Sequence, residues 1–196
     1  PPVDGALPSA FAFAEVSGGK RADLAKVLDR SGAVEWMKAL PASLVALDRI
    51  PLWVPSFAPM LPVGLKHLDL SSFDLDRFCR DYLLGEMPAS LESLRLRPGG
   101  SPPLEFFSGL PRHLKNLILE DVELVDESIA SALPAGLQWL EVPCATLTGS
   151  IALPRNLTGL WVLRMDISEF LGLPGGLTHL SLSEEVPCDD RKLLQE

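Results

Sequence analysis

A ten-residue pattern that begins with Leu-Pro recurs along most of the chain and constrains its fold more than any other feature. The pattern is L-P-x-x-L-x-x-L-x-L, and successive copies begin 20 to 26 residues apart. Seven copies are present, beginning at Leu40, Leu61, Met87, Leu110, Leu133, Leu153 and Leu173. Arg49, Val142 and Val162 replace the last leucine in three of them. A tandem period of this length indicates stacked structural units rather than one ordinary core.

Each copy predicts one short β-strand. In the L-x-L segment the side chains alternate, so both leucines point inward and the residue between them faces outward. The proline restricts the backbone before the strand, and small pairs such as Gly175-Gly176 permit a bend after it. One coil cannot bury its own leucines, whereas stacked coils share a continuous core, which accounts for 38 leucines among 196 residues. We therefore expect an α/β solenoid with one parallel strand per coil.

The segments between the strands predict return structures of different kinds. Residues 71–86 carry apolar side chains at helical spacing, and residues 125–133 do so with Asp126 as a candidate N-cap, so we expect a helix in each. Residues 97–103, RPGGSPP, predict an irregular loop.

The chain divides into three parts on this interpretation. An open solenoid exposes its terminal core and needs a cap. We interpret residues 1–39 as an N-terminal cap with a possible degenerate repeat over 7–16 and a helix, residues 40–182 as the seven repeats, and residues 183–196 as a C-terminal tail or minimal cap.

Charge and composition disfavour several classes of function. The chain has 17 Lys and Arg against 26 Asp and Glu, a net charge of −9 at pH 7, so a surface that binds nucleic-acid phosphates is not expected. It has no run of about 18 uninterrupted apolar residues, so no membrane span is expected either. Cys79, Cys144 and Cys188 match neither a disulfide framework nor a zinc pattern. That favours a cytoplasmic location, and a secreted effector stays open.

The sequence carries no motif for catalysis or cofactor binding. It lacks G-x-S-x-G, a P-loop and H-E-x-x-H. His67, His113 and His179 lie in separate repeats without a cysteine or carboxylate set at metal-ligand spacing. We therefore expect no enzyme activity, no cofactor, no metal and no small-molecule substrate.

The repeat resembles that of the leucine-rich-repeat superfamily over about residues 40–182. Its Leu-Pro start is similar to the LPX repeats of bacterial secreted effectors and to the FNIP repeats of some protists. The superfamily usually places an asparagine three residues after the last leucine. The residues at that position here are Phe73, Gly99, Val122, Ala145 and Met165, so we expect a more apolar packing of that turn.

The resemblance has implications for both fold and function. It implies a curved solenoid with a parallel sheet on the concave face and short helices, 3₁₀ turns and loops on the convex face. It also implies recognition of another macromolecule, usually a protein, because the fold itself brings no catalytic group.

Strand alternation places a candidate partner-binding patch on the concave face. Ile118, Trp139, Trp161 and Leu163 fall on three adjacent strands, and an exposed apolar cluster of this kind is typical of a binding surface. The alternative is that a loop or a shift of register buries the two tryptophans.

Two arginines on the same face are further candidates for contact with a partner. Arg95 and Arg97 are flanked by Asp69 and Glu120. They either hold an acidic group of the partner or simply pair with these neighbours, which would contribute little stability.

These observations predict a non-catalytic module for protein–protein interaction. Two alternatives stay open: a structural subunit of a large assembly, and the substrate-recognition part of a larger enzyme. The second draws on Cys188-Asp189-Asp190-Arg191, which is similar to the Cys-x-Asp-Arg catalytic segment of effector ubiquitin ligases, where a thiolate accepts ubiquitin. A polar tail with a free thiol is the simpler interpretation, because this cysteine follows the last repeat directly.

Overall fold

The computed structural model of the chain describes residues 38, 40–47, 58–71, 87–98, 102–147, 151–165 and 173–182. These ranges include a strand from each copy of the repeat. The expected N-terminal cap and the helix expected over 71–86 lie almost wholly outside the described residues, and the C-terminal tail lies wholly outside them.

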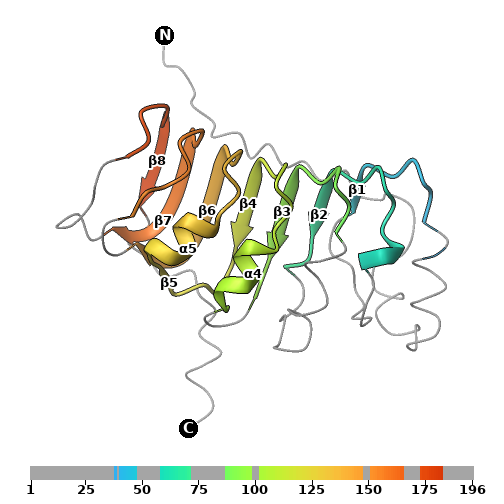
Figure 1. The fold of residues 1–196 in the computed structure, drawn as a ribbon, viewed down its shortest axis with the longest axis horizontal. Helices are drawn as coiled ribbons and strands as arrows, with labels where there is room; N and C mark the ends of the chain where they lie inside the picture. The colour runs from blue at the N-terminus through green and yellow to red at the C-terminus, as the bar shows by residue number, and fades with distance from the viewer. Residues whose placement is uncertain are drawn as a thin grey trace, which may run out of the picture.

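The described strands form one parallel sheet in which each repeat adds a strand beside the previous one (Figure 1). Its order is β1-β2-β3-β4-β6-β7-β8, and β5 pairs with β6 outside this path. The strands are β1 Ala46–Leu47, β2 His67–Asp69, β3 Ser93–Leu96, β4 Asn116–Leu119, β5 Leu124–Val125, β6 Trp139–Leu147, β7 Gly159–Met165 and β8 His179–Leu182. The expected α/β leucine-rich-repeat solenoid is confirmed.

Equivalent leucines of successive coils stack in the core of the solenoid. One continuous line of paired residues runs through Leu47, Leu68, Leu94, Leu117, Leu140, Leu160 and Leu180. All members before Leu180 are at most 2% exposed. The other inward positions of a repeat behave in the same way, as the burial of Leu114 and Leu119 shows. Stacked coils thus bury the leucines that a single coil would expose.

The Leu-Pro start forms a tight turn in every repeat. The proline carbonyl accepts a hydrogen bond from the N–H of the leucine three residues later, at 3.0 to 3.1 Å in all seven copies. This is the bond that closes a β-turn. Polar side chains join some neighbouring turns, because Asn156 donates to the carbonyl of Ala135 at 3.1 Å and Ser90 Oγ lies 2.7 Å from the carbonyl of Val63. The turn therefore sets where each strand begins.

Short helices lie on one face of the sheet (Figure 1). They are the 3₁₀ helix η1 Ala58–Met60 and the helices α4 Leu104–Ser108 and α5 Glu127–Ala132. The helix predicted over 125–133 is confirmed as α5, with the Asp126 side chain accepting a bond of 2.9 Å from the N–H of Ile129. Ala130 and Leu133 of this segment are buried, as expected.

Helix α4 was not predicted. It begins after Pro103, has Glu105 in its first turn, and buries Phe106 and Phe107. The two rings meet edge to face, with centroids 5.2 Å apart and planes at 85°. Residues 97, 98, 102 and 103 before it have no regular structure, in agreement with the loop expected there.

Strand β6 is longer than the L-x-L segment predicts. It continues through Pro143 to Leu147, with a shift of register between Val142 and Thr146 before it pairs again with β7 and with β5. Proline has no N–H to give to the ladder, so the shift falls where pairing is interrupted. Val122 and Ala145 are fully buried, which confirms the apolar turn packing at these two positions.

One expectation about the cysteines is wrong. Cys144 lies in the extended part of β6 and is disulfide-bonded. The three cysteine positions had not predicted a disulfide framework, because their count is odd and their spacing is wide.

The last strand lacks the burial of the others. Leu180 is 44% exposed and Leu182 is 53% exposed, although both occupy inward positions of the repeat. Within the described residues no coil stacks on the outer side of β8, so the leucine line ends there in contact with solvent.

This difference predicts that the same substitution has unequal effects along one line of leucines. Leu117→Ala removes a fully buried side chain in the middle of the stack and should lower the free energy of unfolding by about 2–5 kcal/mol. Leu180→Ala, at the equivalent position of β8, should cost less than about 1 kcal/mol. Urea unfolding followed by circular dichroism measures both, and equal losses would contradict a core that ends at β8.

Candidate concave binding face

The face of the sheet turned away from α4 and α5, which we call the concave face, carries two aligned rows of outward side chains. Pairing of the strands fixes both rows, because each outward residue lies beside its equivalent in the next coil. The first row is Ala46, His67, Ser93, Asn116, Trp139, Gly159 and His179, and the second is Asp69, Arg95, Ile118, Glu141, Trp161 and Ser181. Their pairing agrees with strand alternation, although Asp69, Ser93 and Ile118 are at most 5% exposed.

Trp139 lies across its neighbouring strand. A Cβ atom on Gly159 of β7 would stand 2.0 Å from a carbon of the Trp139 six-membered ring, so the ring occupies the space that this glycine leaves free. On the far side the ring reaches toward His179 of β8, with ring centroids 6.0 Å apart. The absence of a side chain at residue 159 therefore positions the indole.

The apolar candidates do not all reach the surface. Trp139, Trp161 and Leu163 are half-buried. Ile118 is only 5% exposed, between Arg95 and Glu141 in its row, so the expectation that it belongs to an exposed cluster is corrected. The register is the expected one, so no shift of the strands accounts for the burial of the tryptophans.

Arg95 and Arg97 pair with carboxylates of the next coil. Arg95 donates from Nε at 2.8 Å and from its terminal nitrogen at 2.5 Å to one oxygen of Glu120. Arg97 pairs with Asp121, a residue with φ of 61° just after β4. The prediction of pairing with neighbours is confirmed, although Arg97 takes Asp121 and not Glu120 as the partner shown.

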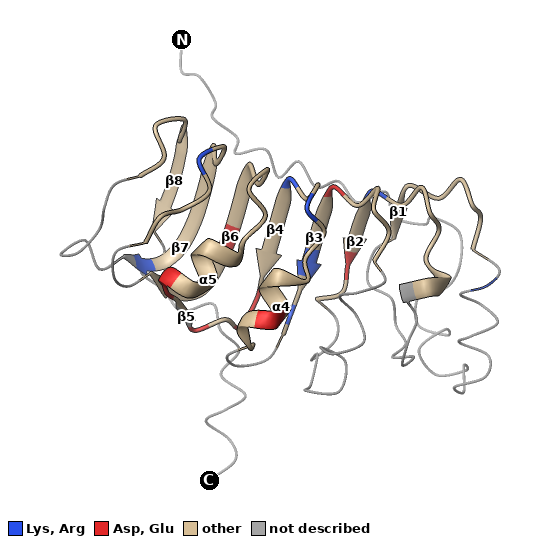
Figure 2. Ribbon diagram, in the orientation of Figure 1, with Lys and Arg blue, Asp and Glu red and all other residues tan. Residues whose placement is uncertain are grey.

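Arg95 is also surrounded by negative charge. Burial alone would lower its pKa, but the hydrogen bonds to Glu120 and the charges of Asp69 and Glu141 raise the pKa above its ordinary value. Asp69 is 2% exposed and accepts hydrogen bonds from the Ser71 backbone N–H at 2.8 Å and its hydroxyl at 2.6 Å. Figure 2 shows the alternation of acidic and basic segments from β2 to β6.

Glu141 and Asp69, both in the second row, have no ion pair within the described residues, but Asp69 accepts the two hydrogen bonds from Ser71. Burial raises the pKa of the Glu141 carboxyl group, and the nearby charge of Arg95 opposes that shift. The indole N–H of Trp139 also favours the ionised carboxylate, but it does not reach hydrogen-bond geometry. The indole nitrogens of Trp139 and Trp161 are both buried without a hydrogen-bond partner in the described structure.

Charges at the rim of the sheet are arranged differently. Glu92 accepts from Lys115 at 2.7 Å and from Lys66 at 3.0 Å, one lysine in the coil on each side. These hydrogen bonds lower the pKa of Glu92 to about 2. The Glu92 side chain is partly exposed and both lysines are about half exposed, so the two ion pairs contribute little stability.

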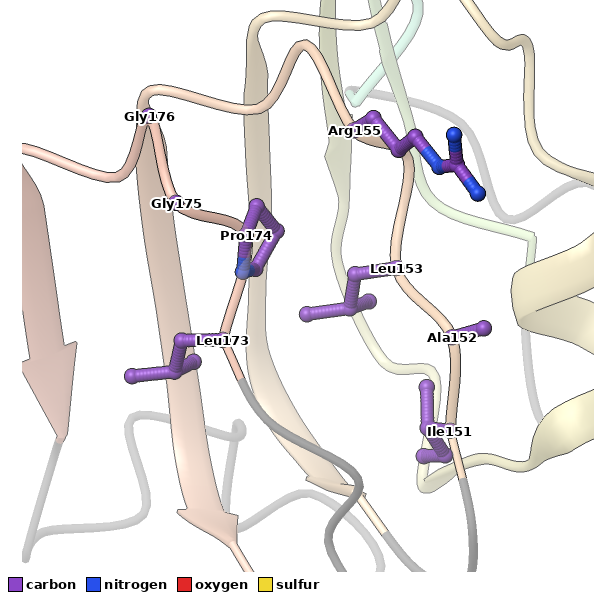
Figure 3. Close-up of a pocket in the computed structure, with 8 residues that line it drawn as sticks. All are labelled: Ile151, Ala152, Leu153, Arg155, Leu173, Pro174, Gly175 and Gly176. Carbon is purple, nitrogen blue, oxygen red and sulfur yellow. The ribbon is translucent and has the colours of Figure 1, made fainter.

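A hollow of about 520 Å³ lies outside the concave face, between the turns of the last two repeats (Figure 3). Ile151, Leu153 and Leu173 supply apolar side chains, and Figure 3 shows Arg155 directed away from them. Polar groups do not converge on this hollow, which distinguishes it from a ligand pocket.

Other sequence candidates do not gather into a site. His67 is half-buried, while His113 and His179 are exposed on separate coils. In the described ranges no three metal-ligating side chains lie together, and none of the helices there has the length and apolar character needed to span a bilayer. Cys188 to Arg191 lie outside the described residues.

The parallel sheet, the stacked leucines and the repeated Leu-Pro turn define the class of fold as a leucine-rich-repeat solenoid. No protein-family model matches the chain, and no curated protein matches it. Among solved structures it is similar to the leucine-rich repeat-containing protein LegL7 from Legionella pneumophila, with a TM-score of 0.41 and 17% identity over 65% of this chain. The match covers 50% of that protein, so this chain spans about half of its length.

Strand alternation puts Gly159 and Glu141 on the concave face, but the sequence alone assigns neither a role. The sequence does indicate the position of Gly159, because the repeat aligns this glycine of β7 with Trp139 of β6. The sequence indicates less about Glu141. Its burial depends on the positions of the two indoles, and its lack of an ion pair within the described residues depends on the pairing of Arg95 with Glu120.

We predict that Gly159→Ala displaces Trp139 without unfolding the solenoid. The new Cβ would overlap the ring, so the indole must swing away from His179 while the leucine core stays intact. The indole N–H resonance of Trp139 should move in NMR spectra, with an unchanged far-ultraviolet circular dichroism spectrum. Gly136→Ala is the matched control, because its Cβ would meet only an ordinary contact of 3.7 Å. A Trp139 resonance unchanged by Gly159→Ala would contradict the placement of the ring.

A second prediction concerns the unfavourable position of Glu141. Because its folded pKa lies above the ordinary value of 4.5, its carboxyl group favours folding most below pH 4.5, and this contribution is lost as the pH rises through the raised value. Glu141→Gln should therefore be more stable than the unmodified chain at pH 7, and the difference should vanish in acid. Urea unfolding between pH 3 and pH 7 tests this, and a less stable variant at pH 7 would show that attraction to Arg95 outweighs burial.

Proposed function

We propose that the chain is a non-catalytic protein-interaction module that binds a protein partner through its concave face. One observation carries the proposal: Trp139 and Trp161, on adjacent strands, lie half-buried on a face that is otherwise mostly polar. Tryptophan is enriched among the residues that dominate binding energy, since one ring gives a large apolar area at little entropic cost. Leu163 lies two residues beyond Trp161 on the same strand and extends the apolar area.

The charged groups of the face support an interaction module over an enzyme. Arg95 and Arg97 are engaged with Glu120 and Asp121, so they are arranged as ion pairs between coils rather than as reactive groups directed into a cleft. A catalytic constellation would instead need a nucleophile or base converging with its orienting group on one concave pocket.

We further propose that the repeats are related to the LPX and FNIP types, which share the Leu-Pro start. The supporting observation is the turn in which the proline carbonyl accepts the N–H of the following leucine, found in all seven copies. The Leu-Pro start is thus a structural device of each coil. Because the proline carbonyl is already bonded within its own turn, we expect a partner to contact the strands and not these turns.

The test is affinity capture with mass spectrometry on the full chain, repeated with Trp139→Ala and Trp161→Ala together. The double variant should recover the partner at least about tenfold less well, because tryptophan anchors typically contribute that much or more. Its circular dichroism spectrum should be unchanged. The control is Val63→Ala with Leu104→Ala, which removes two exposed apolar side chains that lie off both concave rows.

Two outcomes would contradict the proposal. Loss of solubility or of secondary structure in the tryptophan variant would show that the rings are core. Capture that survives the double substitution, with cross-links along a side or an end of the sheet, would favour a structural subunit of a larger assembly.

A further inference from the structure

We propose that Trp139, Trp161 and Glu141 form a subsite on the concave face that holds an arginine side chain of the protein partner. The inference rests on the proposed function and specifies its chemistry. It follows from the position of the two indoles, the negative charge of the face, and the burial of Glu141 without an ion-pair partner within the described residues.

The two indoles and the carboxylate come together through the register of β6 and β7. Glu141 pairs directly with Trp161, and Trp139 precedes Glu141 by two residues on the same side of β6. The Trp139 ring then extends over Gly159, which lies two residues before Trp161 on β7. The carboxylate therefore has an indole beside it on each strand, and both tryptophans are partly exposed.

The charge of this area is negative and incompletely neutralised. Two arginines, Arg95 and Arg97, stand with four carboxylates, Asp69, Glu120, Asp121 and Glu141, on or beside the two rows. Arg95 donates its hydrogen bonds to Glu120 and influences Glu141 through its charge. Glu141 has no ion-pair partner within the described residues, and a cation placed beside it would supply one.

The same groups are unfavourable for folding alone. Burial raises the pKa of Glu141, so the ionised form is held at a cost. The indole nitrogens of both tryptophans are buried with no acceptor in the described structure, which also costs free energy. Clusters of buried polar groups that lack partners are typical of functional sites, because such groups lower the stability of the free protein and become favourable when a ligand binds.

Arginine is the side chain that fits these features best. Its flat guanidinium group stacks on an indole and donates hydrogen bonds to a carboxylate from its edge. A lysine ammonium is a compact and strongly hydrated charge that would lose more on leaving water. An acidic partner side chain would meet Glu141 and its neighbouring carboxylates and would be repelled.

The probe is the peptide acetyl-Gly-Gly-Arg-Gly-Gly-amide, titrated into the full chain while NMR follows the indole N–H resonances of Trp139 and Trp161. The control peptide carries citrulline, which has the shape of arginine without its charge. The arginine peptide should shift both resonances in a saturable way, at least about tenfold more tightly than the citrulline peptide. Equal binding of the two peptides, or no binding of either, would overturn the proposal.

Glu141→Gln tests the carboxylate directly. This variant should bind the arginine peptide at least about tenfold more weakly, because the charge-assisted hydrogen bonds are lost. Glu92→Gln makes the same chemical change at the rim of the sheet, between Lys66 and Lys115, and should alter the affinity less than about twofold. Equal weakening by the two variants would show a general effect of net charge and would overturn the subsite.

Failure of this inference can be separated from failure of the proposed function. If Trp139→Ala with Trp161→Ala abolishes capture of the partner while Glu141→Gln does not, the concave face binds a protein but the arginine subsite is wrong. A lysine peptide that binds as tightly as the arginine peptide would overturn the choice of a guanidinium group.

Discussion

The pairing of equivalent residues between coils is the constraint on which the rest of the molecule depends. Each strand is held in register by its backbone ladder, and its start is set by the turn between the proline carbonyl and the following leucine. Register aligns the buried leucines, which supply the apolar burial that holds the coils together. The same register aligns the outward residues, so the concave rows are a by-product of how the core is built.

The features that repeat could be predicted from the sequence, and those that occur once could not. Inward leucines, outward residues and the N-cap of α5 follow from local spacing, which every coil shares. Helix α4 is only five residues long and owes its place to the burial of Phe106 and Phe107. The extension of β6 depends on pairing with β5 and β7, a contact between coils that no single repeat encodes. For the candidate site, alternation placed both tryptophans on the correct face, but the burial of Ile118 depends on side chains from the flanking strands.

Glu92 and Glu141 show how the same residue type is used in two ways on one sheet. Glu92 stands between two lysines, one from each neighbouring coil, and its pKa falls to about 2. Glu141 stands between Ile118 and Trp161 in its row, and burial raises its pKa. The difference comes from the neighbouring coils and not from the strand that carries each residue. A carboxylate satisfied by its own protein has little to offer a partner, whereas one that is not retains its capacity to bind.

Stability and the proposed recognition are largely separable in this architecture because they use alternate residues of each strand. A change at an exposed outward position leaves the leucine line untouched, so those positions can vary without loss of the core, whereas Asp69, Ser93 and Ile118 of the same rows are buried. Gly159 is an exception, since its missing side chain decides where the Trp139 ring lies and therefore what surface β6, β7 and β8 present together. A residue with no side chain thus shapes the proposed binding surface as strongly as the indole beside it. The consequence is that the surface of such a solenoid is set by combinations of residues across coils, and the surroundings of each outward residue depend on the equivalent position one repeat away.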